Sequence, residues 1–182
     1  MIPPSPSATL LVDGYNIIGA WPLLLYTRDR NGLEAARWQL IEALVSYSAF
    51  QGFDTQIVFD AQYRNTPSNR EVITEHLSIC FTDFEQTADT FIEKICADLN
   101  QELRKFKRRV IVATSDRVQQ LMVTGYGAEW MSAQKLYHEV ESTAQGIRRQ
   151  NKANKQSSSR FLANSLDPKS RQRLAQLRMG LK

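Results

Sequence analysis

The chain has 182 residues, 42% of them hydrophobic, which is enough for one domain with a sizeable core. No apolar stretch approaches the ~20 residues of a membrane-spanning helix, and the N-terminus lacks the basic segment and long apolar run of a signal peptide. Cys80 and Cys96 have no metal-type spacing and are expected to be buried free thiols. These features indicate a soluble, cytoplasmic protein.

The formal charge of +4 is unevenly distributed along the chain. Residues 145–182 hold ten Lys or Arg and one Asp, whereas residues 1–144 hold thirteen Lys or Arg and eighteen acids. An acidic body with a basic tail indicates a polyanionic partner, such as nucleic acid, that is bound through the tail. Basic tails also serve solubility alone, so charge by itself leaves both interpretations open.

In the first half of the chain, the hydrophobic pattern predicts short buried strands separated by one long helix. Gly52 is the expected C-cap of that helix. The predicted segments are a disordered 1–8, a strand at 9–13, a loop at 22–32, a helix at 33–52, a strand at 55–60, a polar loop at 61–71 and a strand at 77–81.

In the second half, strands and helices alternate, and Ser132 is the expected N-cap of the last helix. The predicted segments are a helix at 87–105, a strand at 109–116, a helix at 118–127, a strand at 128–132, a helix at 132–150 and a basic tail at 151–182. Alternation of this kind predicts a three-layer α/β/α domain over 9–150, with a central, mainly parallel sheet covered on both faces.

Acidic residues follow the predicted strands. Asp13, Asp60 and Asp116 come at the ends of the first, second and fourth strands, and Asp89 lies near the start of the helix after the third. Because the carboxyl ends of parallel strands share one edge of a sheet, four carboxylates are predicted to converge there. Gly14 is expected to let the chain turn after the first strand.

Clustered carboxylates repel one another and need a counter-charge, for which a hard divalent cation is the usual choice. Mg²⁺ or Mn²⁺ held there could bind a phosphodiester and activate a water molecule. Asn16 would position a water, a ligand or the Asp13 side chain. Each acid also has a local explanation, as a turn former, a helix N-cap or a partner of a helix dipole.

Other chemistries find less support in the sequence. There is no GxGxxG motif and no phosphate-loop lysine motif, and neither His76 nor His138 has the setting of a catalytic base. Among the aromatic residues, Tyr15 and Trp21 are the better candidates for stacking on a base, because both lie near the turn after Asp13.

Five motifs together resemble one known family. LLVDGYNIIGAWP, IVFDAQYR, FEQTADTFIEK, VIVATSDRVQQ and GAEWMSAQKLYHEVE occur here in the order typical of YacP-like NYN domain proteins, which belong to the PIN-like nuclease group. The resemblance covers roughly residues 9–145. It implies a compact α/β/α fold of the PIN type and a divalent-metal endoribonuclease linked to mRNA cleavage in association with the ribosome.

The family motif implies a set of site residues. It marks Asp13, Asn16, Asp60, Asp89 and Asp116 as catalytic, with Ser115 and Arg117 beside the last. In one departure, Gln86 stands where the family pattern has Glu directly before the TAD motif; a supporting acid is then missing, or Glu85 substitutes for it.

The main hypothesis is therefore a metal-dependent endoribonuclease acting on single-stranded RNA. Asp13, Asp89 and Asp116 would hold Mg²⁺ or Mn²⁺ directly or through water, and Asp60 would ligate the ion or orient a water. The expected substrate-binding residues are Asn16, Arg64, Ser115, Arg117, Arg148, Arg149, Lys152 and Lys155.

Two alternatives remain open at this point. One is a non-catalytic RNA- or ribosome-binding module, in which the acids are caps and turns and the tail supplies the binding. The other is a phosphatase acting on small nucleotides, which shares the acidic edge but does not need the tail.

Overall fold

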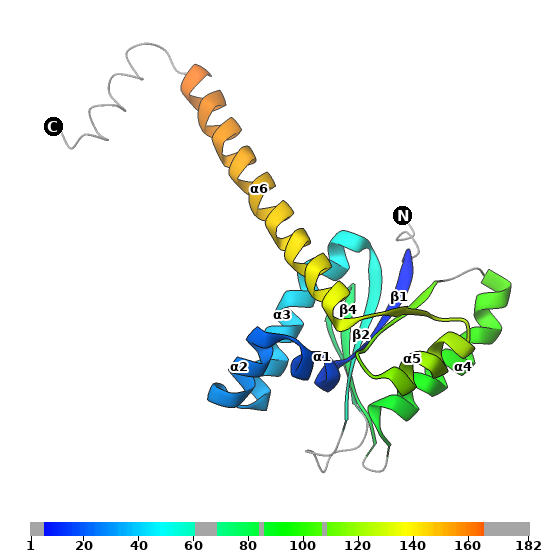
Figure 1. The fold of residues 1–182 in the computed structure, drawn as a ribbon. Coiled ribbons are helices and arrows are strands. Elements are labelled where there is room, and N and C mark those ends of the chain that lie inside the picture. Colours follow the sequence, from blue (N-terminus) through cyan, green and yellow to red (C-terminus); the bar gives the residue numbers. More distant parts are fainter. Residues whose placement is uncertain (1–5, 61–68, 84–85, 107–108, 166–182) are drawn as a thin grey trace. The chain divides into compact units, whose positions relative to one another are not determined.

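Six strands form one sheet in a computed structural model that describes residues 6–60, 69–83, 86–106 and 109–165 (Figure 1). The strand order is β3-β4-β2-β1-β5-β6, and all neighbouring pairs are parallel except β3 with β4. The strands are β1 (Ala8–Asp13), β2 (Phe53–Phe59), β3 (Asn69–Thr74), β4 (Leu77–Phe81), β5 (Val110–Ala113) and β6 (Glu129–Met131).

Helices cover both faces of this sheet, with α1, α2 and α3 on one face and α4 and α5 on the other (Figure 1). The start of α6 packs on the first face, through Ala133, Leu136 and Val140. The helices are α1 (Gly14–Ala20), α2 (Pro22–Asn31), α3 (Leu33–Gln51), α4 (Ala88–Phe106), α5 (Arg117–Gly125) and α6 (Ala133–Ser165). The predicted α/β/α architecture is confirmed.

The central strands are buried on both faces. Leu10 and Val12 of β1 belong to the hydrophobic cluster beneath α1, α2 and α3, whereas Leu11 belongs to the cluster beneath α4 and α5. The alternation repeats on β2, where Ile57 and Val58 join opposite clusters. Burial on both sides explains why these strands read as continuous apolar runs.

β1 lies where the strand order changes direction. It pairs with β2 on one side and with β5 on the other, in a register that places Asp13 beside Val58 and Val12 beside Ala113. In open parallel sheets, ligands bind outside the carboxyl ends of the strands at such a point. Asp13 is the last residue of β1, so the fold places it there.

Two predicted loops are wrong in part. The loop predicted at 22–32 is the helix α2, which begins with Pro22 at its first position; the run PLLLY lacks the apolar period that reveals an amphipathic helix. The loop predicted at 61–71 contains the start of β3, an edge strand that pairs only with β4. Its sequence NREVIT is largely polar, as edge strands often are. Residues 61–68 lie outside the described residues.

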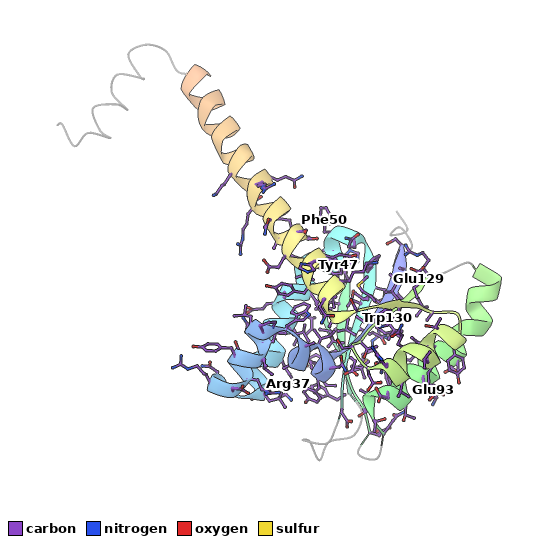
Figure 2. The ribbon with its side chains drawn as sticks, viewed as in Figure 1. Arg37, Tyr47, Phe50, Glu93, Glu129 and Trp130 are labelled. Atoms are coloured by element: carbon purple, nitrogen blue, oxygen red, sulfur yellow. The ribbon has the colours of Figure 1, made fainter. Side chains whose placement is uncertain are left out.

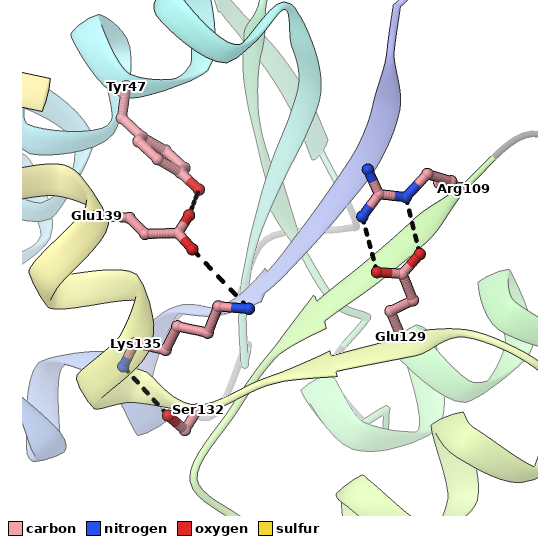
Figure 3. A network of polar contacts seen from close by, with 6 residues as sticks. All are labelled: Tyr47, Arg109, Glu129, Ser132, Lys135 and Glu139. Carbon is pink, nitrogen blue, oxygen red and sulfur yellow. Dashed lines mark hydrogen bonds and ion pairs between the residues drawn. The ribbon is translucent and has the colours of Figure 1, made fainter.

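Both predicted helix ends are confirmed. Gly52 adopts the left-handed conformation, with φ of 65°, directly after α3. The hydroxyl of Ser132 accepts a hydrogen bond from the backbone N–H of Lys135 at 3.1 Å, as an N-cap does (Figure 3). The helix that follows continues to Ser165, beyond its predicted end at residue 150.

Polar contacts connect the first turns of α6 to α3, and others connect β5 to β6 at the edge of the sheet (Figure 3). The Tyr47 hydroxyl on α3 donates to Glu139 on α6 at 2.5 Å, and Lys135 lies 3.9 Å from the same carboxylate. Arg109 donates two hydrogen bonds of 2.8 Å to Glu129, which joins the starts of β5 and β6. Figure 2 shows Tyr47 and Glu129 among the other side chains of the domain.

The chain divides into two compact units, residues 1–143 and 144–182. The predicted domain of 9–150 and tail of 151–182 stay predictions. At the N-terminus, residues 1–5 of the predicted disordered segment lie outside the described residues, whereas Ser7 hydrogen-bonds to the backbone of Gly52 and Ala8 opens β1. Both cysteines are buried and free, as predicted. Within the described part of the chain, no helix is long and apolar enough to cross a membrane.

Position 14 requires a glycine because there is no room for a side chain there. Positive φ angles occur at Gly32, Gly52 and Gly127 and not at Gly14, so the expected turn is not what requires a glycine here. A Cβ at position 14 would lie 2.3 Å from the ring of Phe59. That ring is buried and stacks on Phe81 at a centroid distance of 5.7 Å, so it cannot swing aside without disturbing the core.

We expect Gly14→Ala to lower the free energy of unfolding by about 1–3 kcal/mol, the usual cost of overpacking a core. Urea denaturation of the purified variant measures this. Gly19→Ala is the matched control, because a Cβ there meets nothing within 4 Å and an added alanine suits a helix. Equal stabilities of the two variants would contradict the conclusion that the Phe59 ring leaves no space for a side chain at position 14.

Candidate active site at the carboxyl edge of the sheet

Asp13 ends β1 and also caps the helix that follows. One of its carboxylate oxygens accepts the backbone N–H of Asn16 at 3.2 Å, and Asp13 has the extended backbone of an N-cap residue. The residue is only 7% exposed. The local explanation considered for Asp13 is a turn before Gly14, whereas the structure shows a helix N-cap at the edge of the sheet.

Asp116 likewise caps a helix and lies at the carboxyl edge of the sheet, after the neighbouring strand β5. It follows β5 as the N-cap of α5, and its Oδ1 accepts the N–H groups of Val118 at 2.7 Å and Gln119 at 3.1 Å. Its own N–H donates to the hydroxyl of Thr114 at 3.0 Å. These contacts fix the Asp116 side chain at the carboxyl end of β5.

The other two acids reach the same edge from different elements. Asp60 directly follows β2, and Asp89 lies in the first turn of α4. Oδ1 of Asp89 accepts a hydrogen bond from the side-chain amide of Gln119 on α5 at 2.6 Å. Four acids, each attached to a different strand or helix, are thereby oriented toward one region.

The four carboxylates line one open pocket of about 660 Å³. The pocket contains all five residues predicted as catalytic, together with Tyr15, Arg28 and Thr87. Those five are Asp13, Asn16, Asp60, Asp89 and Asp116. The structure thus brings together the residues that the strand-end argument predicted to meet.

The pocket is unfavourable for negative charge. Burial raises the pKa of Asp13 from 3.8 to about 6, and repulsion from Asp89, Asp116 and Asp60 adds to the shift, while the hydrogen bond from Asn16 opposes it. The pKa of Asp89 is also raised, first by burial and then by Asp116 and Asp60. A cation or a phosphate-bound metal would relieve this repulsion.

The donor set fits a hard divalent cation. Carboxylate and amide oxygens are the ligands that Mg²⁺ and Mn²⁺ prefer. Among the residues that the structure describes, no three Asp, Glu, His or Cys side chains lie close enough together to hold one ion directly. Mg²⁺ is commonly held by one or two carboxylates, with water or substrate phosphate at its other positions. The pocket therefore fits an ion bound partly through water.

Hydrogen bonds connect three of the acids into what we call the carboxylate network. Oδ1 of Asn16, whose N–H binds Asp13, accepts the backbone N–H of Ser115 at 2.6 Å. Asp116 comes next along the chain, and Gln119 connects it to Asp89. Asn16 thus holds the loop before α5 as well as the Asp13 side chain.

Several predicted residues lie outside the pocket. Ser115 and Arg117 are exposed beside it, and Ser115 acts through its backbone N–H. Arg148, Arg149 and Lys152 are exposed on the part of α6 that belongs to the second unit. Arg64, Glu85 and the side chain of Lys155 lie outside the described residues, so the question that Gln86 raised stays open.

Trp21 and Glu93 both have structural roles. Trp21 is buried, and its indole N–H donates to the backbone carbonyl of Ala133 at 2.9 Å, so of the two stacking candidates only Tyr15 lines the pocket. Glu93 accepts a hydrogen bond from Tyr126 at 3.0 Å on the α4–α5 side, where Figure 2 labels it.

Sequence reasoning missed Arg28 and Gln119. Arg28 was concealed because its helix was predicted as a loop. The Asp116–Gln119 spacing is that of a capping box, in which the fourth residue reaches back to the N-cap N–H. The N–H of Asp116 goes to Thr114 instead, so the Gln119 side chain is used elsewhere.

Comparison with known proteins agrees with this architecture. The family model of the YacP-like NYN domain matches residues 10–179. Uncharacterized protein YacP from Bacillus subtilis (strain 168) is 38% identical over 141 residues, which make up 77% of this chain and 79% of that protein.

Two solved structures are also similar. The crystal structure of Rae1 (YacP) from Bacillus subtilis superposes with a TM-score of 0.64 at 32% identity, covering 94% of this chain and 95% of that one. The crystal structure of a tryptophan-to-leucine mutant of the same Bacillus subtilis protein gives a TM-score of 0.67 at 32% identity, covering 92% of this chain and 98% of that one.

The raised pKa of Asp13 predicts a pH-dependent stability. Between pH 4 and 6, the unfolded chain releases a proton that the folded protein retains, so this carboxyl destabilises the folded state increasingly as pH rises. In EDTA, Asp13→Asn should therefore exceed the wild type in stability at pH 7–8 by on the order of 2–3 kcal/mol, and match it below pH 4.

Urea denaturation across this pH range is the measurement. Asn retains an acceptor for the Asn16 N–H, whereas Asp13→Ala removes charge and cap together. Asp13→Ala should show the same pH dependence, offset downward by about 1 kcal/mol. If the free energy of unfolding changed with pH in the same way for wild type and Asp13→Asn, the raised pKa of Asp13 would be contradicted.

Proposed function

The chain belongs to the YacP-like NYN domain family, which is nuclease-like, and we propose on this premise that it is a metal-dependent endoribonuclease that cleaves single-stranded RNA. The observation that carries the proposal is the convergence of four carboxylates from four elements on one pocket. mRNA is the proposed substrate, cut in the cytoplasm in association with the ribosome.

The proposed ion is Mg²⁺ or Mn²⁺, which supplies a polarised phosphodiester and an activated water when bound. Asp13, Asp89 and Asp116 would hold it, directly or through water. Asp60, which directly follows β2, would orient the attacking water. Asn16 holds the Asp13 side chain and the loop before α5 in fixed relative positions, because it is hydrogen-bonded to both.

Arg28 gives the pocket a positive side chain among its acids. It lies on α2, is exposed, and pairs with Asp29 at 2.8 Å in the free protein. An exposed pair of this kind exchanges readily, so the guanidinium is available to a phosphate oxygen of the substrate. Single-stranded RNA suits this arrangement because its backbone can enter a pocket lined on several sides.

Tyr15 is positioned to contact a nucleobase. Its ring lines the pocket and packs at 5.1 Å from Phe59, and its hydroxyl accepts a hydrogen bond from Arg37 at 3.0 Å. Figure 2 labels Arg37 on α3. A ring held from two sides loses little freedom on stacking, which favours contact with a base beside the scissile phosphate.

A non-catalytic RNA- or ribosome-binding module is the second candidate. It is favoured by the capping bonds of Asp13 and Asp116, which give both residues a purely structural task. The raised pKa of Asp13 argues the other way, because a turn or cap alone does not require a buried carboxylate among three like charges.

The first test is cleavage of labelled single-stranded RNA with Mn²⁺, with and without translating ribosomes. Asp13→Asn should lose activity by about 100-fold or more, as expected for a group at the reacting centre, while remaining folded. Asp54→Asn, on β2 and outside the pocket lining, is the control and should cleave like the wild type. A fully active Asp13→Asn variant would refute the assignment of the active site to this pocket. A wild-type protein that binds RNA but does not cleave it in any condition would favour the binding module.

A second test concerns the basic residues on the part of α6 that belongs to the second unit. Metal-free RNA binding should weaken with salt, and replacing Arg148, Arg149 and Lys152 with Gln should reduce the slope of log K against log salt by about 2 if all three contact single-stranded RNA. Replacing Arg70, Lys94 and Lys135 with Gln removes the same charge elsewhere on the surface. Equal slopes for the two triple variants would show a non-specific charge effect.

A further inference from the structure

Gln119 occupies a core position with a polar side chain. Gln119 and Val123 are the buried residues of α5, and Gln119 is 1% exposed. Val123 packs in the hydrophobic cluster of α4 and α5, with Ile92 and Val112. A buried amide in such a layer is unfavourable unless its polar atoms find partners.

The backbone nitrogen and the side-chain nitrogen of Gln119 donate to two different pocket carboxylates. Its backbone N–H donates to Asp116 at 3.1 Å, and its side-chain Nε2 donates to Asp89 at 2.6 Å. Asp89 and Asp116 line the same pocket, and as like charges they repel each other. A neutral residue that donates to both holds the two carboxylates at a fixed separation without adding charge.

The carbonyl oxygen of the Gln119 amide is not stabilised in this way. Oε1 of Gln119 is buried and has no hydrogen-bond partner among the described residues. An unpaired buried acceptor lowers stability, and an apolar side chain of similar shape would avoid that loss. Fold stability alone therefore does not explain an amide at this position.

Capping does not explain it either. In a capping box, the Gln119 side chain would bond to the N–H of Asp116. That N–H already donates to Thr114 at 3.0 Å, and the amide reaches across to α4 instead.

We propose that Gln119 is a positioning residue, which sets the Asp89 carboxylate relative to Asp116 so that the pocket can hold a divalent cation. The metal part of this inference rests on the proposed function. The placement of Asp89 by Gln119 does not, and it can be tested in the metal-free protein.

The test compares Gln119→Met with Gln120→Met in the full-length chain. Methionine preserves the length of the side chain and removes both the Nε2 donor and the unpaired Oε1. Position 120 is the matched control, because it is the neighbouring glutamine on α5 and is only partly buried. Calorimetric titration measures Mn²⁺ affinity, and urea denaturation in EDTA measures stability.

We expect Gln119→Met to bind Mn²⁺ about 10–100-fold more weakly than the wild type, the usual effect of losing a partner that orients a ligand. Its urea midpoint should equal or exceed that of the wild type, and Gln120→Met should change neither quantity. Unchanged Mn²⁺ affinity in Gln119→Met would overturn the proposal. A loss of stability in EDTA would overturn it as well, because it would assign Gln119 to the fold.

A wild-type protein that neither binds Mn²⁺ nor cleaves RNA would refute the proposed function and leave the placement to be decided separately. Crystal structures of metal-free wild type and Gln119→Met decide it. A displaced Asp89 carboxylate in the variant supports the positioning role, and an unmoved one overturns it.

Discussion

Parallel pairing of β1 between β2 and β5 is the constraint on which the site depends. Because these three strands run in the same direction, their carboxyl ends meet at one edge, and Asp13 is carried there by a strand buried on both faces. Asp60 and Asp116 follow the two neighbouring strands. The connection through α4 brings Asp89 to the same edge from the other layer.

Bringing like charges together has an electrostatic cost that the surroundings only partly offset. The backbone N–H of Asn16 donates to Asp13, which favours its charged form. Burial acts in the opposite direction and is the larger influence on Asp13. Below about pH 6 the Asp13 carboxyl of the metal-free pocket therefore retains a proton that a bound cation would displace, so metal affinity and pH are coupled.

Helix capping and a role in the pocket are compatible in this protein. A cap bond engages one oxygen of a carboxylate, and both Asp13 and Asp116 cap through Oδ1. A carboxylate has a second oxygen with lone pairs of its own. Capping also fixes the side-chain direction, so the helix starts of α1 and α5 orient the acids that the proposed chemistry needs.

The sequence by itself determined the layer order, the core strands and the four acids, because burial on both faces and strand-end position leave local patterns that can be read directly. It concealed α2 and β3, since PLLLY has no clear helical period and the edge strand is polar. Only the tertiary structure decided that Gly14 makes room for Phe59, that Arg28 lines the pocket and that Gln119 reaches Asp89. Each of these is a contact between residues far apart in the chain, and no local pattern specifies which distant side chain a residue will meet.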